Sequence, residues 1–198
     1  FLPGASLTFD WFRIDVDNAI AAQTATQLLQ ACAIRQVNCD LIDRASSGEV
    51  LELRQAVVNL SSIHVSGFDT TLGYAFDTRI GDFTASVDAS YLDSFRTTIV
   101  QPDGSTEIDE RAGKSDQPRS TFPRWKGQAS LRYSRGDFDA GYKARYIGSS
   151  YDVAGNPVNG GEIDAITYHD LQLAYSFGDS KYRVALGIDN FTDRQPPA

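Results

Sequence analysis

The stretch WKGQASLRYSRGDFDAGYKARYIG, residues 125–148, decides the fold class, because its side chains alternate on both sides of a short Arg-Gly turn. Every second position of each arm is apolar or small, and the charged side chains of the arms lie between those positions. Alternation with a period of two is typical of a β-strand that has one apolar and one polar face. The stretch therefore predicts a β-hairpin whose apolar face packs on a protein core or on lipid.

A two-residue turn at Arg135-Gly136 fixes the register that we expect for this hairpin. The aromatic side chains then lie near both ends of the apolar face. The pairs expected on the opposite face are Arg132 with Asp139, Gln128 with Lys143, and Lys126 with Arg145. The last pair places like charges opposite each other, so we expect an acidic loop residue or a ligand beside it.

The dimensions and the charges of the hairpin favour a membrane. Eleven residues at about 3.3 Å each, tilted by roughly 40°, rise about 27 Å, close to the height of the apolar band of an outer-membrane barrel. A Lys or Arg on the lipid side near the midplane would cost roughly 2 to 4 kcal/mol. We therefore expect Phe138 and Tyr142 to face lipid, and Arg132 and Lys143 to face a lumen.

The composition excludes some classes of protein. The chain has 198 residues, of which 22% are charged and 41% hydrophobic, and its net charge is -8. An acidic chain is a poor partner for nucleic acid, because phosphate binding needs an excess of Lys and Arg. No stretch approaches the roughly 20 apolar residues of a membrane helix. Motifs for catalysis, for phosphate binding and for metal binding are absent from the sequence, so we expect no enzyme, no metal site and no cofactor.

Further alternating stretches predict about seven strands in total. A short helix is expected at residues 19–32, an interruption near Gly67, and a solvated loop over the acidic run at 103–110. A parity slip near Trp11 and Phe12 indicates a bulge, or the point where that strand leaves a buried region. Short and long connections alternate along the chain. Such sorting is typical of an up-and-down barrel with tight turns at one end and large loops at the other, and a Greek-key sandwich has no reason for it.

Together these segments resemble the C-terminal part of the β-barrel of TonB-dependent outer-membrane receptors. The segments that carry the resemblance are DWFRIDVDNAI (10–20), SSIHVSGFD (61–69), ASYLDSF (89–95), FPRWKG (122–127), RYIG (145–148), YHDLQLAYSF (168–177) and GIDNFTDRQPP (187–197). The family implies a barrel of about 22 strands with a plugged lumen, of which this chain would supply about the fifteenth to the twenty-first. The chain begins at Phe1 without an initiator Met or a leader, so either a signal peptide has been removed or a larger protein has been cut. The resemblance favours the cut, and residues 1–198 would then be a C-terminal barrel segment of a larger protein. The plug and the closing strand would lie outside it.

The resemblance also implies a function and a location. An intact receptor of this family sits in the bacterial outer membrane and imports a scarce solute, such as a ferric siderophore, cobalamin or an oligosaccharide, with energy supplied through TonB. The implied partners are outer-membrane lipid, the protein's own plug and remaining strands, TonB through the missing N-terminal part, and the small-molecule ligand. A passive porin-type barrel and a soluble β-sheet binding domain are the alternatives that the sequence leaves open.

Two sets of residues are candidates for special roles. Cys32 and Cys39 are either a disulfide, as the family often has on an extracellular loop, or two free thiols of a cytosolic domain. Five residues of the hairpin are expected to face the lumen, where they would contact the ligand or the plug. They are Lys126, Arg132, Asp139, Lys143 and Arg145. The Arg-Gly-Asp sequence at 135–137 is expected to be a periplasmic turn rather than an adhesion motif.

Overall fold

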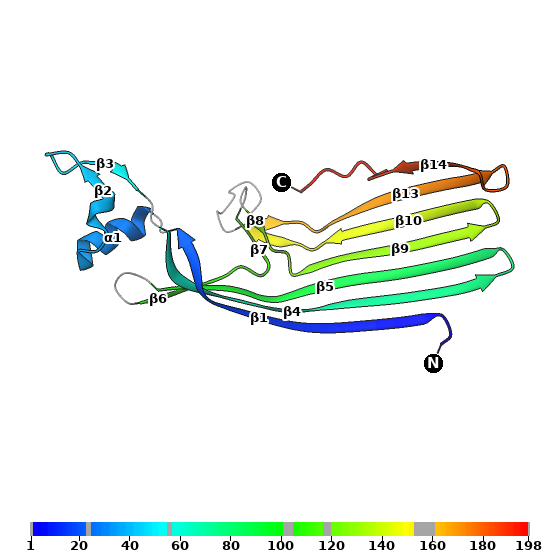
Figure 1. The fold of residues 1–198 in the computed structure, drawn as a ribbon, viewed down its shortest axis with the longest axis horizontal. Coiled ribbons are helices and arrows are strands. Elements are labelled where there is room, and N and C mark those ends of the chain that lie inside the picture. The colour runs from blue at the N-terminus through cyan, green and yellow to red at the C-terminus, as the bar shows by residue number, and fades with distance from the viewer. Residues whose placement is uncertain are drawn as a thin grey trace. The chain divides into compact units, whose positions relative to one another are not determined.

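The alternating stretches of the chain form one long antiparallel meander. The computed structural model describes residues 2–22, 25–54, 57–100, 105–116, 120–152 and 161–197. Strand order in the sheet follows chain order, β1-β4-β5-β9-β10-β13-β14, and β6 (Thr106–Glu110) pairs with β5 outside this path (Figure 1). The bounds of the seven strands are Ala5–Ala22, Val57–Thr78, Gly81–Val100, Trp125–Arg135, Phe138–Ile147, Ile166–Phe177 and Tyr182–Ile188. The prediction of an up-and-down antiparallel sheet of about seven strands is confirmed, and the sheet is open, with β1 and β14 at its edges.

The chain divides into two compact units. The first contains Phe1–Phe12, Ser66–Asp93 and Ala112–Ala198, and the second contains Arg13–Val65 and Ser94–Arg111. The meander therefore contributes to both units. The term main sheet is used below for the part of the meander that belongs to the first unit.

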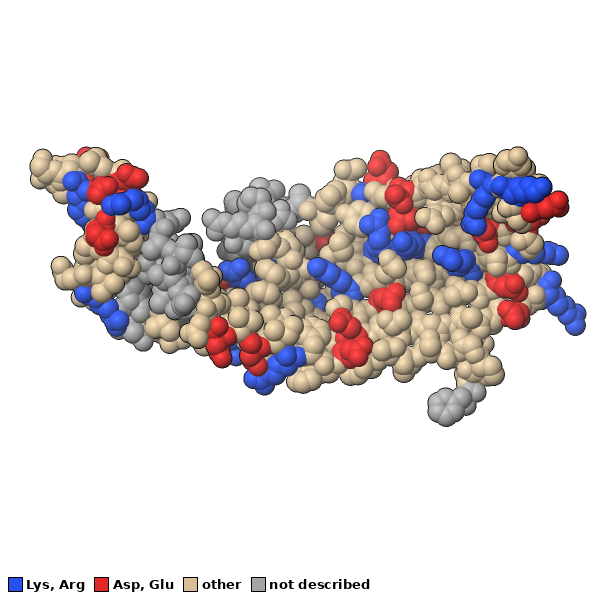
Figure 2. All heavy atoms as spheres, in the orientation of Figure 1, with Lys and Arg blue, Asp and Glu red and all other residues tan. Residues whose placement is uncertain are grey.

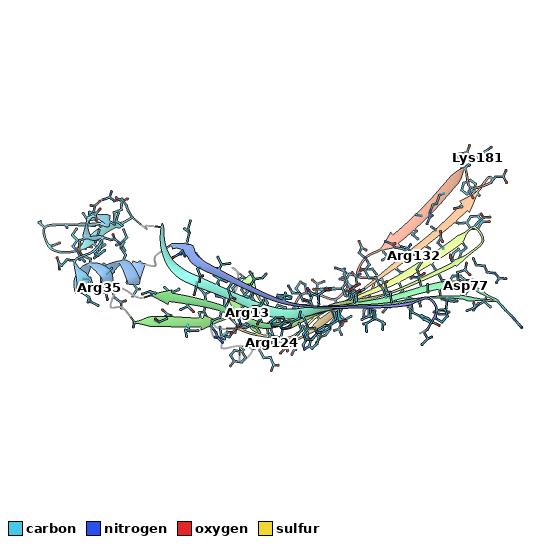
Figure 3. The ribbon with its side chains drawn as sticks, turned by 60° about the horizontal axis from the view of Figure 1, so that its bottom comes forward. Arg13, Arg35, Asp77, Arg124, Arg132 and Lys181 are labelled. Carbon is cyan, nitrogen blue, oxygen red and sulfur yellow. A yellow bond between two sulfur atoms is a disulfide. The ribbon has the colours of Figure 1, made fainter. Side chains whose placement is uncertain are left out.

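The connections of the main sheet are sorted by length. Between β4 and β5 the chain turns at residues 79–80, between β9 and β10 at 136–137, and between β13 and β14 at 178–181. Asp77 and Lys181, which flank or lie in two of these turns, are found at the same end of the sheet (Figure 3). The connections from β5 to β9 and from β10 to β13 are much longer. The predicted alternation of short and long connections is thus confirmed.

The two long connections of the first unit pair with each other in a small sheet. Its order is β12-β11-β7-β8, and β11 runs parallel to β7. The bounds are Glu162–Ile163, Ser150–Asp152, Lys114–Asp116 and Ser120–Thr121. Ser115 is fully buried there, and its hydroxyl lies 2.8 Å from the hydroxyl of Thr121. This pairing ties the two long connections together.

The second unit contains the helix and a hairpin. Helix α1 (Ala25–Arg35) leads to the short 3-10 helix η1 (Cys39–Leu41), and β2 (Ile42–Arg44) pairs with β3 (Val50–Leu53). Leu28, Ala31 and Ile42 are buried in it. A disulfide joins Cys32 to Cys39, with their Cα atoms 4.9 Å apart. The helix was expected at 19–32, but residues 19–22 continue β1, because Ala and Ile are tolerated in a paired strand and tertiary pairing overrides helix propensity.

Two local predictions differ from the structure. Strand β4 runs without a break through Gly67, where an interruption was expected. Strand β1 is continuous at Trp11 and Phe12, and a bulge at this point stays a prediction. A side chain at Gly67 would collide with the Tyr91 carbonyl oxygen and the Phe12 ring, so the glycine permits a close approach rather than ending the strand. The acidic run at 103–110 is a strand over Thr106–Glu110, where Glu110 accepts hydrogen bonds from Ser94 and the Phe95 amide. Residues 103–104 lie outside the described part of the chain.

Candidate functional site

The β9–β10 hairpin turns at a glycine that has positive φ. Arg135 pairs with Phe138, so the two loop residues are Gly136 and Asp137, with φ of 57° at Gly136. Glycine in the first loop position is the requirement of a type II′ hairpin turn. The register therefore differs by two residues from the expected one, which had the loop at Arg135-Gly136. A shift of two preserves parity, and each residue keeps the face that was expected for it.

One face of the main sheet is apolar across its strands. The register aligns Val87 of β5 with Ala129 of β9, Ala129 with Ala144 of β10, and Leu173 of β13 with Leu186 of β14. Val87 is 46% exposed and Leu186 is 62% exposed. A soluble protein rarely leaves a surface of this extent uncovered by protein or lipid. We call it the apolar face.

Aromatic rings gather at the two ends of the apolar face. At the end of the long connections, Phe68 lies 5.4 Å from Phe9 and 5.3 Å from Tyr91, and Tyr91 lies 4.7 Å from Trp125. At the turn end, ring pairs link successive strands. These pairs are Phe76 with Phe83 (5.2 Å), Phe83 with Tyr133 (5.0 Å), Tyr133 with Phe138 (6.3 Å), and Phe177 with Tyr182 (5.5 Å). Two aromatic belts around a band of small and aliphatic residues are typical of an outer-membrane barrel wall.

The opposite face, here called the polar face, carries all five residues that the sequence analysis assigned to the lumen. The shifted register changes their neighbours. Lys126 pairs with Ile147 and Arg145 with Gln128, so the predicted like-charge pair of Lys126 and Arg145 is wrong. Arg132 pairs with Gly141, Asp139 with Ser134, and Lys143 with Ser130, so the predicted pairs of Arg132 with Asp139 and of Gln128 with Lys143 are wrong as well. The turn glycine is the physical reason, because it fixes the register for the whole hairpin.

Arg145 is held by a carboxylate of the next strand. Its Nε donates to Asp170 Oδ2 at 2.9 Å and its Nη2 donates to Asp170 Oδ1 at 3.0 Å, the paired geometry that Arg and carboxylate groups favour. The Asn190 amide also donates to Asp170 Oδ1 at 2.9 Å. The Arg145 guanidinium lies 5.4 Å from the centre of the Tyr168 ring. The Asp170 side chain is only 8% exposed. Through these hydrogen bonds its carboxylate joins β13 to β10 and to the segment after β14.

A second ion pair lies closer to the turn end of the polar face. Arg183 of β14 contacts Asp139 of β10 at 2.9 Å, with β13 between the two strands. The Arg183 side chain is 59% exposed and the Asp139 side chain is 34% exposed. This pair is open to water and contributes less than the clamp around Asp170.

Three cations of the polar face have no ion-pair partner among the described residues, namely Lys126, Arg132 and Lys143. A hollow of about 280 Å³ lies beside two of them, Arg132 and Lys143, and the carboxylates Asp170 and Asp189 line it as well. Figure 2 shows Lys and Arg in blue over the region where Figure 1 draws β9, β10, β13 and β14. The hollow thus combines ammonium, guanidinium and amide donors with carboxylate acceptors, and Lys143 lies opposite Asp170 in the register of β10 and β13.

Asp170, Arg183 and Asn190 were missed by the sequence analysis. Asp170 has the polar parity of its strand, between Tyr168 and Gln172, and this signal was readable from residues 166–177. Its partners were not readable, because Arg145 and Asn190 reach it from other parts of the chain.

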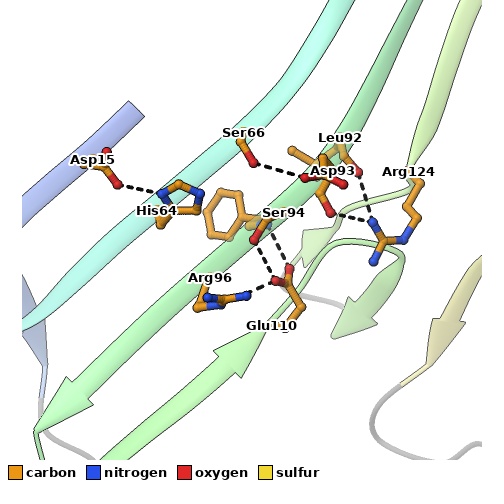
Figure 4. A network of polar contacts seen from close by, with 10 residues as sticks. Asp15, His64, Ser66, Leu92, Asp93, Ser94, Arg96, Glu110 and Arg124 are labelled. Carbon is orange, nitrogen blue, oxygen red and sulfur yellow. Dashed lines mark hydrogen bonds and ion pairs between the residues drawn. The ribbon is translucent and has the colours of Figure 1, made fainter. Parts of the chain in front are cut away.

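Polar contacts also fasten the strands near the long connections (Figure 4). In the first unit, Arg124 donates to the Leu92 carbonyl at 3.3 Å, and Ser66 lies 3.5 Å from Asp93. In the second unit, His64 Nδ1 lies 2.6 Å from Asp15 Oδ1. These contacts are local to the strands and bring together no set of catalytic groups.

Comparison with protein families agrees with this geometry. The model of the β-barrel of TonB-dependent receptor-like proteins matches residues 1–191. The chain belongs to this family. Comparisons with curated proteins and with solved structures found no match. The TonB-dependent receptors are transporters of the bacterial outer membrane rather than enzymes, and the open antiparallel sheet corresponds to part of such a barrel.

Family membership also indicates the general partners of such a barrel. Receptors of this family have a plug and work with TonB. Among the described residues, no helix combines the length and the apolar character needed to cross a bilayer.

Proposed function

We propose that this chain is the C-terminal barrel segment of a receptor that imports a scarce solute across the outer membrane with energy supplied through TonB. Family membership supports the transport class, and the two faces of the main sheet support the orientation. The apolar face with its aromatic belts would contact lipid, and the polar face would line the lumen. The plug and the remaining strands would come from the rest of the receptor.

The observation that carries the proposal is the contrast between paired and unpaired cations on the polar face. Arg145 is held by Asp170, whereas Lys126 and Lys143 form no close ion pair among the described residues, and Lys143 lies opposite Asp170 on β13. Unpaired cations in a lumen would raise the local concentration of an anionic or acceptor-rich solute. The candidate classes are a ferric siderophore, cobalamin and an oligosaccharide. Lys126, Arg132 and Lys143 are the candidate contacts, and Asp139 and Arg145 act within ion pairs.

Uptake by the full-length receptor tests the proposal. Cells that carry the receptor would be offered labelled ferric siderophore, cobalamin or oligosaccharide, with and without functional TonB. We expect uptake of one class, and we expect that uptake to stop when TonB is removed. Uptake that continues at the same rate without TonB would instead establish a passive porin-type barrel.

Substitution separates the two kinds of cation. We expect Lys126→Gln and Lys143→Gln together to reduce the affinity for the imported solute, because both remove unpaired charges from the lumen. The matched control is Arg79→Gln with Lys181→Gln, which removes two cations from the short turns, outside the polar face. Unchanged affinity in the double variant would reject a ligand role for these lysines.

A further inference from the structure

Three hollows on the polar face follow one another along β10. The hollow nearest the short turns has a volume of about 390 Å³ and is lined by residues 139–141 of β10. The hollow of about 280 Å³ described above is lined by residues 141–143, and a third hollow, of about 510 Å³, is lined by residues 145–147. Because β10 runs from Phe138 to Ile147, the three hollows together cover its length. We call them the turn-end, middle and loop-end hollows.

Neighbouring hollows share part of their lining. Arg132, Gly141 and Gln172 line both the turn-end and the middle hollow. Gln128 lines both the middle and the loop-end hollow. Hollows that share lining residues are adjacent, so the three form one track, which begins over β4, β5 and β9 at the loop end and reaches β13 and β14 at the turn end. The whole track lies within the first unit.

Each hollow is lined by groups of both charges. These groups are Asp88 and Lys126 in the loop-end hollow, Asp170 and Lys143 in the middle hollow, and Asp139 and Arg183 in the turn-end hollow. A solute that travels through a pore needs contacts that are favourable enough to admit it and weak enough to release it. A hollow that combines cations with carboxylates offers hydrogen-bond donors and acceptors with little net charge to retain an anion. A polar solute can therefore exchange its hydrogen bonds at one level for similar ones at the next.

Small side chains line the turn-end hollow. Ala174 of β13 pairs with Ala185 of β14, and Gly187 follows on β14. The fold does not require glycine at position 187, because its φ is not positive and an added Cβ would meet its nearest atom, Gln172 Cγ, at 3.8 Å, an ordinary contact. A larger side chain would therefore fit the sheet and would occupy the hollow instead.

We infer that the track is the route by which the imported solute travels along the barrel wall once the plug has moved, so that the solute leaves the lumen beside β13 and β14. Lys126 and Lys143, candidate contacts of the proposed function, line the loop-end and the middle hollow. The turn-end hollow continues the track from these lysines to the short turns, which are expected to face the periplasm. The inference rests on the proposed function and deepens it, since it assigns the side of the lumen that the solute uses.

Binding and uptake by the full-length receptor test this inference. Ala185→Phe and Gly187→Phe each place an aromatic ring in the turn-end hollow, away from Lys126 and Lys143. Cells would be offered labelled ferric siderophore, cobalamin and oligosaccharide. For the class that is taken up, equilibrium binding would be measured without TonB and the uptake rate with it. We expect both variants to bind with unchanged affinity and to lose maximal rate by about tenfold, the effect of a barrier that is about 1.4 kcal/mol higher.

Ala75→Phe is the matched control. Ala75 lies on the polar face of β4 beside its short turn, as Ala185 does on β14, but it lines none of the three hollows. We expect normal affinity and a normal rate. If a Phe variant does not assemble, Ala185→Cys and Ala75→Cys would be modified with a bulky maleimide after assembly in the membrane, and the same difference is expected. The two cysteines of the chain are joined in a disulfide and do not compete for the reagent.

Other outcomes would overturn the inference. Unchanged uptake in both Ala185→Phe and Gly187→Phe would place the route elsewhere, and an equal loss of rate in Ala75→Phe would spread it over the whole lumen. A loss of affinity in the two variants would assign the turn-end hollow to solute binding. Normal uptake with a plug that leaves the lumen at lower urea would show that plug side chains fill the hollow instead. If the unmodified receptor shows no TonB-dependent uptake, the transport proposal itself fails, and the route fails with it.

Discussion

Successive residues of each strand lie on opposite faces of the main sheet, and the two faces differ in the kind of contact that their side chains make. On the apolar face, aromatic rings at both ends and small or aliphatic side chains between them leave large hydrophobic groups exposed. On the polar face, stability comes from specific contacts such as the Asp170 clamp. The comparison teaches that the effect of a substitution depends on parity more than on position along the chain.

The largest effect is expected from a charge on the apolar face. Val87→Arg should destabilise the full-length receptor in bilayers by roughly 2 to 4 kcal/mol, the cost of a cation facing lipid near the midplane. Its neighbour Ser86 points to the polar face, and Ser86→Arg should cost only about 1 kcal/mol through the lost hydrogen bond to Ser130. Denaturant unfolding in vesicles measures both. Equal losses in the two variants would break the distinction between the faces.

The next effect is expected at the Asp170 clamp. Asp170→Asn leaves the Arg145 guanidinium without its carboxylate, and we expect a loss of about 1 to 3 kcal/mol, because the carboxylate is buried and accepts three hydrogen bonds. Asp139→Asn removes the same charge from a pair that is open to water and should cost about 0 to 1 kcal/mol. A double-mutant cycle with Arg145→Ala would show whether the energy belongs to the pair, and a coupling near zero would contradict the clamp.

A smaller effect is expected at the hairpin turn. Gly136→Val forces a β-branched residue into positive φ and should cost about 1 to 2 kcal/mol. Gly136→Asn is the matched control, because Asn tolerates this conformation and should cost much less. Unfolding of the two variants under the same conditions compares them. If the Val and Asn variants are equally stable, the positive φ at Gly136 does not set the register of the β9–β10 hairpin.

Removal of the disulfide is expected to have the smallest effect on the unfolding free energy of the main sheet. Cys32→Ser with Cys39→Ser should make residues 25–54 more sensitive to protease, because a constraint between α1 and η1 is lost. The unfolding free energy of the main sheet should stay within about 0.5 kcal/mol, since the two regions belong to different compact units. Reductant added to the unmodified receptor should reproduce the protease result, and an unchanged digestion pattern would contradict it.

Much of the fold was predictable, because the alternation of apolar and polar residues that marks a strand with one apolar face is visible in a short stretch of sequence. Residues 125–148 predict the hairpin and the face of each side chain, and the sorted connections predict the meander. The register was readable but was misassigned: a Gly-Asp loop has glycine at its first position, as a type II′ turn requires, whereas an Arg-Gly loop would force Arg135 into positive φ. The misassigned register paired Arg145 with Lys126, and its true carboxylate partner, Asp170, lies on another strand.

The sequence by itself determined the antiparallel meander, the assignment of residues to an apolar and a polar face, and the family resemblance, since each depends on the order and period of side chains. Only the tertiary structure decided which charges meet. Asp170 holds both Arg145 and the Asn190 amide, and Arg183 reaches Asp139 across an intervening strand. The physical reason is that parity repeats every two residues and survives a shift of the register, whereas an ion pair depends on the register itself.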